Sequence, residues 1–516
     1  MPPVQVGAFH NLSTPMIPHK LITIPPVVTP ANFEDVMQQA IALELATIPT
    51  YLSTYYSINR AQDQDALYAT LQAQLATRPG VTSADVDALA QELKLDVLVY
   101  ANKTAALVMS VVIEEMLHLA LACNVKQAIV GPPDLLSINE ALVFPTMLDG
   151  HEPEFPINAA RLSLAQLSTF LQIESPRPFT NSADAAEKAP DVKYKTIGQL
   201  YLDIQQCIAD NYPGPYPARP QLVSAPKAAA RHRPYYSQNS INTVYYDREH
   251  APKFASSSDS GDLIGVVDAP SALAAINEIM HQGEGNIKDN QSELRFGPNG
   301  MPIPLPVKNG EVQFKPGDYD DTPDAELSHF AKFLEAYSLG VHYQQKFEDI
   351  GGLDDFFSYF VYDQAADPKL VDYLASGNTA LACCAQLGNA IFTYILLMIE
   401  ACYSADEDTQ FRVFLYGVHK SMIWLLSGIG NGIRNYTYAR GNRTYAGSLT
   451  FEYFNFSRAN PVSPKQQIMA LVEQLALADP TNWGWLTLPE NSAYWPSLPD
   501  VRLDHRVVAH VPAVPA

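Results

Sequence analysis

The sequence predicts a mainly α-helical protein built on a four-helix bundle, with long irregular insertions and additional helices toward the C-terminus. Three observations support this fold class. Long segments repeat apolar residues at helical spacing. Stretches rich in Pro, Gly, Ser and Asn separate these segments. Acidic residues recur inside the most apolar helices, where a carboxylate is costly unless a partner or a cation compensates it.

The composition is that of a globular protein with a large core. The chain has 516 residues, of which 47% are apolar and 17% charged, and a formal net charge of −22. The negative charge argues against nucleic acid and anionic membranes as partners. The five cysteines show no zinc-binding spacing and are expected to be reduced. The first residues lack the pattern of a signal peptide, so the expected location is the cytoplasm.

Four segments are expected to form the bundle helices, namely 32–58, 95–130, 270–284 and 323–350. In the first, Asn32 is a candidate N-cap and Pro49 is expected to kink the helix. Asp268 is expected to cap the third, which has Pro270 in its first turn. Between the second and third lie two further helical pieces, around 162–176 and 196–211, joined by a polar connection.

The C-terminal part is also expected to be helical. Its predicted helices are 380–402, 410–433 and 464–478. The first has nearly membrane length but contains Glu400 and lacks basic flanks, so a buried core helix is expected. The chain is therefore divided into a core at 30–350 and an extension at 351–516 packed on it. The core carries loop insertions at about 132–160, 212–262 and 286–320, the last with a small hairpin.

Three histidines follow a glutamate by three residues, which places both side chains on one face of a helix. The pairs are Glu115 with His118, Glu278 with His281, and Glu326 with His329. The first pair lies in a long apolar run and is expected to bind metal rather than face solvent. Glu114 is equally close to His118, and spacing does not choose between Glu114 and Glu115. For Glu326 and His329 the alternative is a solvated first turn.

Glu44 is also an acidic residue in an apolar helix, and its presence strengthens the prediction of a metal site at Glu115 and His118. Carboxylates from two helices repel each other in one core unless a cation lies between them. A glutamate from each of two helices and Glu-x-x-His from each of the other two is the ligand set of di-iron and di-manganese bundles. Two Fe ions are the expected cofactor, with Mn or a mixed Fe/Mn pair as alternatives.

Six segments occur in an order that is similar to a known family: ALELATIPTYLSTYYSI, VVIEEMLHLALACNVKQAI, TIGQLYLDI, QGEGN, ELSHFAKF and YAGSLTFEYF. They resemble the ferritin-like domain family found in iminophenyl-pyruvate dimer synthases, enzymes of bisindole pigment pathways that couple two oxidised amino-acid molecules. The resemblance covers about residues 30–455. The metal ligands that it implies are Glu44, Glu115, His118, Glu284, Glu326 and His329. In the pigment enzymes this domain is one part of a larger protein, so the resemblance implies the fold and the metal site and leaves open whether the dimerising activity is shared.

Together these features predict a non-haem dimetal oxidase or oxygenase of specialised metabolism that uses O2 or peroxide. Its substrate would be a small amino-acid-derived molecule, and oxidative coupling is one reaction of this kind. The alternatives are a catalase-like peroxide-handling dimetal protein and a non-enzymatic metal-binding protein. Neither nucleic acid nor membrane is expected as a partner, and a homodimer is compatible with the sequence.

Tyr51, seven residues after Glu44, is the candidate to support a metal ligand by a hydrogen bond, with core packing as its alternative role. Gln282 is a second such candidate. The sequence assigns no role to Glu278, His281, Tyr201, His419 or Glu452.

Overall fold

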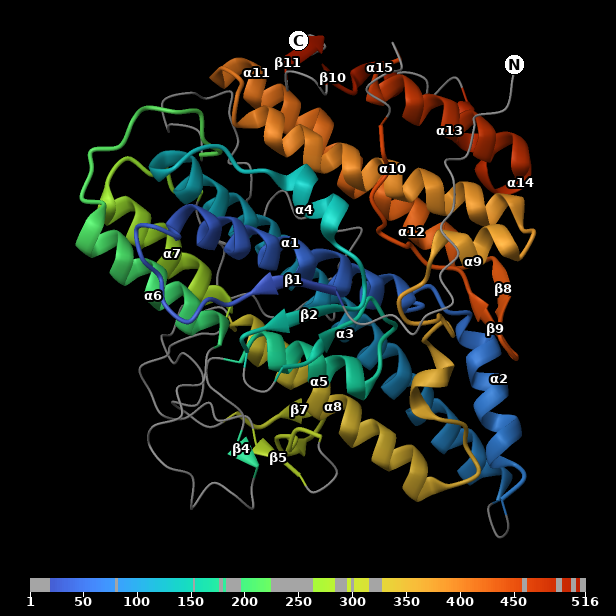
Figure 1. Ribbon diagram of the computed structural model, residues 1–516. Helices are drawn as coiled ribbons and strands as arrows, with labels where there is room; N and C mark the ends of the chain where they lie inside the picture. Colours follow the sequence, from blue (N-terminus) through green and yellow to red (C-terminus); the bar gives the residue numbers. More distant parts are fainter. Residues whose placement is uncertain are drawn as a thin grey trace.

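The computed structural model confirms a mainly helical protein (Figure 1). It describes residues 19–78, 82–151, 154–175, 180–181, 196–223, 263–283, 295–297, 301–314, 327–456, 462–488, 494–502 and 507–510. The helices of its N-terminal part are α1 (Phe33–Ser57), α2 (Gln64–Leu75), α3 (Ser83–Ile129), α4 (Leu135–Ala141), α5 (Leu164–Ile173), α6 (Ile197–Asn211), α7 (Ala269–Gly283) and α8 (His329–Ile350).

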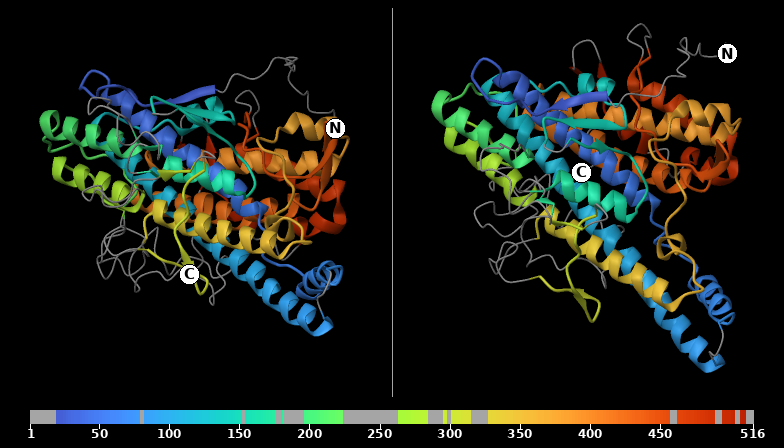
Figure 2. Two further views of the ribbon diagram at one scale, coloured as in Figure 1. Left: turned by 90° about the horizontal axis from the view of Figure 1, so that it is seen from below. Right: turned by 60° about the horizontal axis from the view of Figure 1, so that its bottom comes forward.

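Helices α1 and α3 form the centre of the bundle and pack along each other (Figure 2). Helix α3 is one continuous helix of 47 residues, so it begins well before residue 95, where the second bundle helix was predicted to start. Its N-terminal part projects from the bundle and α2 packs against it. Helix α1 continues through Pro49, and the side chain of Asn32 accepts a hydrogen bond from the Thr29 amide rather than from the helix.

Two interrupted helices complete the bundle. Helices α5 and α6 follow each other along α1, because the loop before α5 bonds to Ser57 and the end of α6 reaches Phe33. Helices α7 and α8 follow each other along α3, since Gln282 contacts His118 and further along Tyr100 donates to the Ala336 carbonyl. The predicted bundle therefore lacked α5 and α6, which the sequence placed around a loop.

The ends of α5 and α7 border the two interruptions. In the sequence, Pro176 follows Glu174 by two residues, and a proline is unfavourable for continuing a helix. Helix α7 is described up to Gly283. At its other end Asp268 caps α7 as predicted, by accepting from the Ser271 amide. The two interruptions lie at the same level of the bundle.

The structure also contains short β-strands. The strands are β1 (His19–Thr23), β2 (Thr146–Asp149), β3 (Pro156–Ile157), β4 (Thr180–Asn181), β5 (Arg295–Phe296), β6 (Val307–Lys308), β7 (Glu311–Val312), β8 (Thr437–Arg440), β9 (Arg443–Ala446), β10 (Asp500–Arg502) and β11 (Val507–His510). Strand β2 pairs with β1 in parallel and with β3 antiparallel. The antiparallel pair β6–β7 confirms the small hairpin expected in the 286–320 segment.

The C-terminal part packs around α10. Its helical elements are η2 (Phe356–Tyr359), α9 (Leu370–Ala375), α10 (Thr379–Cys402), α11 (Glu407–Arg412), η3 (Val413–His419), η4 (Ser421–Leu426), α12 (Ser427–Ile433), α13 (Pro464–Ala478), α14 (Pro480–Trp483), η5 (Gly484–Thr487) and α15 (Tyr494–Ser497). Helix α13 matches its predicted range. The segment expected as one helix at 410–433 is divided, and its η3 and η4 pieces have π-helical turns.

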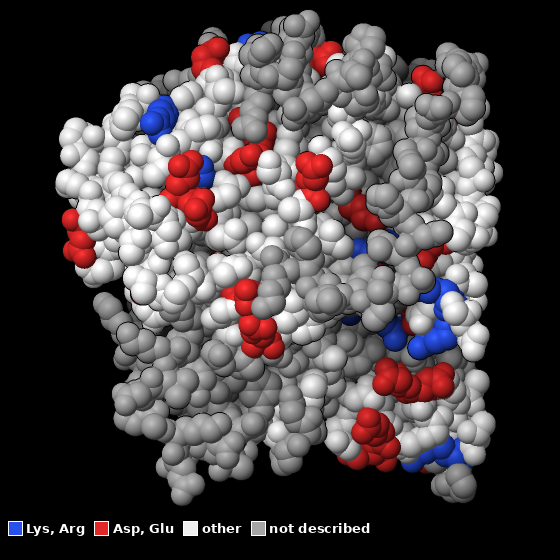
Figure 3. All heavy atoms as spheres, in the orientation of Figure 1, with Lys and Arg blue, Asp and Glu red and all other residues white. Residues whose placement is uncertain are grey.

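Helices α3 and α10 are long and apolar enough to span a membrane by length and composition. In α3, 94% of the most apolar window is buried inside the protein, and in α10 the share is 89%. The expected buried core helix at 380–401 is therefore observed. On the face shown in Figure 3, described acidic side chains are spread out, while the basic ones gather mainly near one edge.

Candidate metal centre

Four predicted ligands from three helices meet at the level of the two interruptions. Glu44 comes from α1, Glu115 and His118 from α3, and His329 from the first position of α8. The His329 Nδ1 atom lies 2.8 Å from Glu115 Oε1. The His118 Nδ1 atom lies 3.7 Å from both Glu44 Oε2 and Glu115 Oε1. Glu115, His118 and His329 thus offer ligand atoms within 4.8 Å of one another, a spacing at which they could hold a metal ion.

These side chains are buried, with relative exposures of 2% for Glu44, Glu115 and His118 and 0% for His329. Burial and the charge of Glu115 hold the pKa of Glu44 well above its ordinary value. Burial also raises the pKa of Glu115, but hydrogen bonding with His118 and His329 outweighs it and keeps that pKa low. Burial lowers the pKa of His329, yet Glu114 and Glu115 hold it well above the ordinary value. Without a cation, the cluster therefore retains protons that a metal ion would replace.

Both histidines direct Nδ1 toward the carboxylates. The Nε2 atom of His329 lies 2.8 Å from Glu114 Oε2, and that of His118 lies 3.1 Å from Gln282 Oε1. An ionised carboxylate and an amide oxygen only accept, so each Nε2 keeps its hydrogen, and Nδ1 is the nitrogen that would bind an ion after losing any proton it carries. The His329 Nδ1 atom faces Glu115 Oε1 inside the cluster. A buried imidazole nitrogen in this state fits a metal ligand.

The structure separates the roles of the two neighbouring glutamates. Glu115 faces the cluster and accepts a 2.6 Å hydrogen bond from Thr47 Oγ1. Glu114 faces away, toward His329 Nε2 and the Nζ atom of Lys332. Spacing had left this choice open, because both glutamates are within reach of His118. The placement of Glu115 in the cluster agrees with the residue that the family resemblance implies.

Glu174 is a site residue that the sequence analysis missed. It follows the last residue of α5, is 6% exposed, and its Oε2 atom lies 3.6 Å from His329 Nδ1. The only sequence feature that could have indicated Glu174 as a ligand is its position as a lone acidic residue after an apolar helix. Ordinary helix ends have the same pattern. The position of Glu174 depends on the interruption between α5 and α6. The α5–α6 line of the bundle therefore contributes a carboxylate that the sequence analysis did not predict.

Two buried tyrosines support the carboxylates. Tyr51 donates to Glu174 Oε1, and Tyr201 donates to Glu44 Oε1. Tyr51 therefore holds a carboxylate of the site, and its ring also packs against Phe170 and Phe333. Burial raises the pKa of Tyr51, with Glu174 as the next cause, so this phenol stays protonated and acts as a donor.

The remaining candidates differ in position. Glu284 and Glu326 lie outside the described residues. His281 is exposed on the last turn of α7, whereas Gln282 bonds His118 and also donates to Glu278 Oε1 at 3.0 Å. Gly283 borders the site, since a Cβ atom added there would lie 3.6 Å from Glu174 Oε2.

Two residues of unassigned role lie in the C-terminal part. Glu452 accepts a hydrogen bond from the Leu370 amide at the start of α9, which is a structural role. His419 ends the π-helical segment η3 and is partly buried, and burial lowers its pKa. Neither residue lines the cavity of the candidate metal centre.

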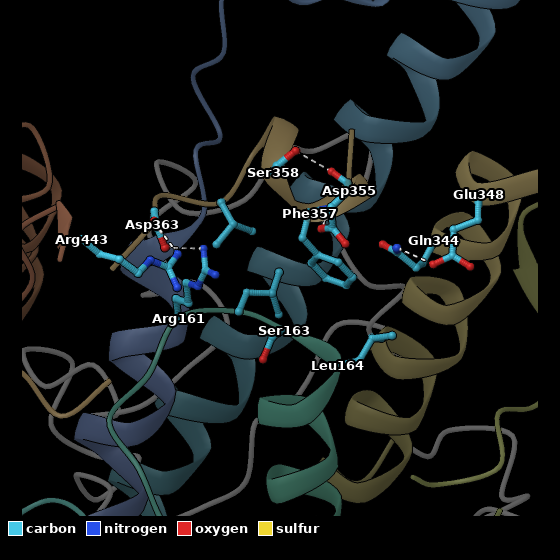
Figure 4. A pocket seen from close by; sticks show the side chains of 12 residues that line it. Arg161, Ser163, Leu164, Gln344, Glu348, Asp355, Phe357, Ser358, Asp363 and Arg443 are labelled. Atoms are coloured by element: carbon cyan, nitrogen blue, oxygen red, sulfur yellow. Dashed lines mark hydrogen bonds and ion pairs between the residues drawn. The ribbon is translucent and has the colours of Figure 1, made fainter. Parts of the chain in front are cut away.

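The cluster opens into a small cavity with an apolar wall. The residues that line it are Leu43, Glu44, Thr47, Glu115, His118, Ile173, Glu174, Ile197, Tyr201, Ile279 and Gly283. A larger pocket, of about 670 Å³, lies elsewhere between the ends of α5 and α8 and is lined by Arg161, Phe357 and Arg443 among others (Figure 4). The buried rings of Phe170 and Phe333 pack against each other and lie, along α5 and α8, between the residues that line this pocket and those of the metal centre.

Comparison with known proteins found one family model and a solved structure that match the chain. A model of the family described as "Ferritin-like" matches residues 37–338. A solved structure of a ferritin-like protein from Caulobacter vibrioides is 17% identical, with 78% of this chain and 98% of that chain covered. Its TM-score is 0.34, a similarity too weak to bear on the fold. Among curated proteins, none matches the chain with significance.

Proposed function

Because the chain belongs to the ferritin-like family, we propose that it is a non-haem dimetal oxidase or oxygenase that uses O2 or peroxide. The observation that carries the proposal is the buried group of Glu115, His118 and His329, with Glu44 and Glu174 beside it. Two metal ions bound there would supply the redox chemistry, while the protein supplies their position and a closed cavity.

The donor set favours iron or manganese. Carboxylate oxygens and imidazole nitrogens together suit Fe(II) and Mn(II) better than Ca²⁺ or Mg²⁺, which prefer oxygen alone. Among the described residues, this part of the core holds four buried carboxylates, those of Glu44, Glu114, Glu115 and Glu174, and the lysine Lys332, which bonds Glu114. The excess of negative charge is what bound divalent cations would compensate.

The protein's own residues would hold the site in a fixed geometry. Tyr51, Tyr201 and Thr47 each donate to a different carboxylate, which limits how far these groups move when ions bind. The isoleucines of the cavity wall keep bulk water away and strengthen the interactions inside. We propose a small amino-acid-derived substrate in specialised metabolism, as in the iminophenyl-pyruvate dimer synthases that the sequence resembles.

A peroxide-handling protein is the second candidate, and the size of the cavity favours it. The described residues leave little space beside the ligands, enough for ions and small molecules such as peroxide. The two candidates differ in a measurable way. An oxidase or oxygenase consumes O2 faster when an organic substrate is added, whereas a catalase-like protein releases O2 from peroxide alone.

Metal analysis of the purified chain tests the shared premise. We expect about two Fe or Mn ions per chain, in line with the dimetal bundles, and loss of metal in Glu115→Ala and His118→Ala. His281→Ala is the matched control, because His281 is exposed on α7 and should leave the metal content unchanged. A folded wild-type chain that cannot be loaded with Fe(II) or Mn(II) would exclude the proposed function.

A further inference from the structure

The two histidines of the metal centre both direct Nδ1 toward carboxylates, and their Nε2 atoms have partners of different charge. His329 Nε2 bonds the carboxylate of Glu114 at 2.8 Å. His118 Nε2 bonds the neutral amide oxygen of Gln282 at 3.1 Å. The orientation of that amide is set by its nitrogen, which donates to Glu278. One histidine is therefore supported by a charged acceptor and the other by a neutral one.

The charge of Glu114 is itself compensated. Lys332 Nζ lies 2.8 Å from Glu114 Oε1 and 2.7 Å from Oε2, so it bonds both oxygens. The lysine is 1% exposed and the glutamate 2%. Lys332 lies three residues after His329 on α8, and Glu114 precedes Glu115 on α3. The ion pair therefore joins α3 to α8 immediately behind the metal ligands, and it lets an ionised carboxylate persist in the core.

This arrangement has a defined effect on a metal-ligating imidazole. A carboxylate that accepts from one ring nitrogen fixes the tautomer and the ring orientation, and it makes the other nitrogen a stronger donor. A neutral amide fixes the tautomer but adds less electron density. Lys332 partly compensates the negative charge of the Glu114 carboxylate. That carboxylate still accepts from His329, because the ammonium bonds Glu114 and not the histidine.

We propose that Glu114 and Lys332 form a positioning pair that holds His329 Nδ1 toward the metal and makes His329 the stronger of the two histidine donors. The inference rests on the proposed metal-binding function. Neither residue is expected to contact a substrate or the metal. The pair acts through His329 only.

The double variant Glu114→Gln/Lys332→Met tests this proposal. It removes both charges of the ion pair together, and glutamine still offers an oxygen to His329. Either single substitution would leave one buried charge without the other and would confuse folding with metal binding. We expect thermal unfolding like that of the wild type, and a roughly 10- to 100-fold loss of Co(II) affinity in equilibrium dialysis. The visible spectrum of bound Co(II) is expected to shift as well.

The matched control is Gln282→Met, which removes the neutral support of His118. We expect a smaller loss of Co(II) affinity than in the double variant, and an equal or larger loss would contradict the inequality of the histidines. A folded double variant with wild-type affinity and spectrum would show that the pair is only structural. A wild-type chain that binds no Co(II), Fe(II) or Mn(II) would instead overturn the proposed function, and this inference with it.

Discussion

At the scale of single residues, the site is defined by buried carboxylates, and the role of each depends on which partner its side chain points toward. Glu114 and Glu115 are adjacent, yet one orients His329 and the other faces the cluster. Glu174 joins the cluster from the end of α5 and is held by Tyr51. A residue of ordinary appearance in the sequence thereby becomes a candidate ligand.

Glu174→Gln is expected to weaken metal binding roughly 10- to 100-fold, because the amide has no charge while Tyr51 can still donate to its oxygen. Equilibrium dialysis with Fe(II) or Mn(II) measures the effect. Glu140→Gln, at an exposed position of α4, is the control and should bind metal like the wild type. Unchanged affinity in Glu174→Gln would remove this residue from the site.

Glu284 and His281 give a second residue-scale prediction. The family resemblance implies Glu284 as a ligand, and His281 is exposed. Glu284→Ala is therefore expected to lose metal, whereas His281→Ala is expected to retain it. Counting bound metal in the two variants decides the matter, and the reverse result would show that the assignment on this segment is wrong.

At the scale of elements, the site depends on how α8 packs against α3. Gly340 lies at their contact, where an added Cβ atom would lie 2.5 Å from the Tyr100 hydroxyl and 3.0 Å from Leu164 Cδ2. The same hydroxyl donates to the Ala336 carbonyl at 3.0 Å. The absence of a side chain at residue 340 thus permits the close approach that brings α8, and with it His329, to the cluster.

Gly340→Ala is expected to lower the free energy of unfolding by about 1–3 kcal/mol, because the methyl group overfills a packed contact. Gly428→Ala in α12 is the matched helical control. Its nearest neighbour would lie 3.9 Å away, so a gain of roughly 0.4–1 kcal/mol is expected. Urea denaturation measures both variants. A Gly340→Ala protein as stable as the wild type would mean that Tyr100 moves at little cost.

At the scale of the whole molecule, the C-terminal helices are tied to the bundle by buried polar contacts. Tyr403 donates to the Ala120 carbonyl at 3.0 Å, and Glu400 accepts from the Leu135 amide at 2.7 Å. Arg434 donates to the carbonyls of Tyr56 and Ile58 at the end of α1. Global unfolding is therefore expected to report on the metal centre as well as on the extension.

The stability of the metal-free protein is expected to fall as pH rises. Glu44 has a pKa raised above 4.5 and His329 a pKa raised above 6.5, so above those values the folded chain binds more protons than the unfolded chain. The slope of unfolding free energy with pH is then negative. Urea denaturation of the metal-free protein between about pH 5 and 8 measures it, since these values bracket the ordinary histidine pKa.

Metal should reverse this trend, because ions bind the deprotonated ligands of the folded state. At 100 times its Kd, a bound ion adds about 2.7 kcal/mol to stability, and the affinity rises with pH as protons leave. Glu44→Gln is the control in metal-free protein and should reduce the fall of stability with pH. A metal-free protein that becomes more stable with rising pH would contradict the directions of both pKa shifts.

The sequence by itself determined the helical class, the positions of α1, α7, α10 and α13, and the prediction of Glu44, His118 and His329 as ligands, whereas Glu115 was preferred to Glu114 only through the family resemblance. Helical periodicity and local capping are short-range properties, and Glu44, Glu115 and His118 are conspicuous because they interrupt apolar runs. Only the tertiary structure decided that α5 and α6 complete the bundle, that Glu174 joins the site, and that Glu114 supports His329. These facts depend on which helix faces align over long sequence separations, and no local pattern encodes that alignment.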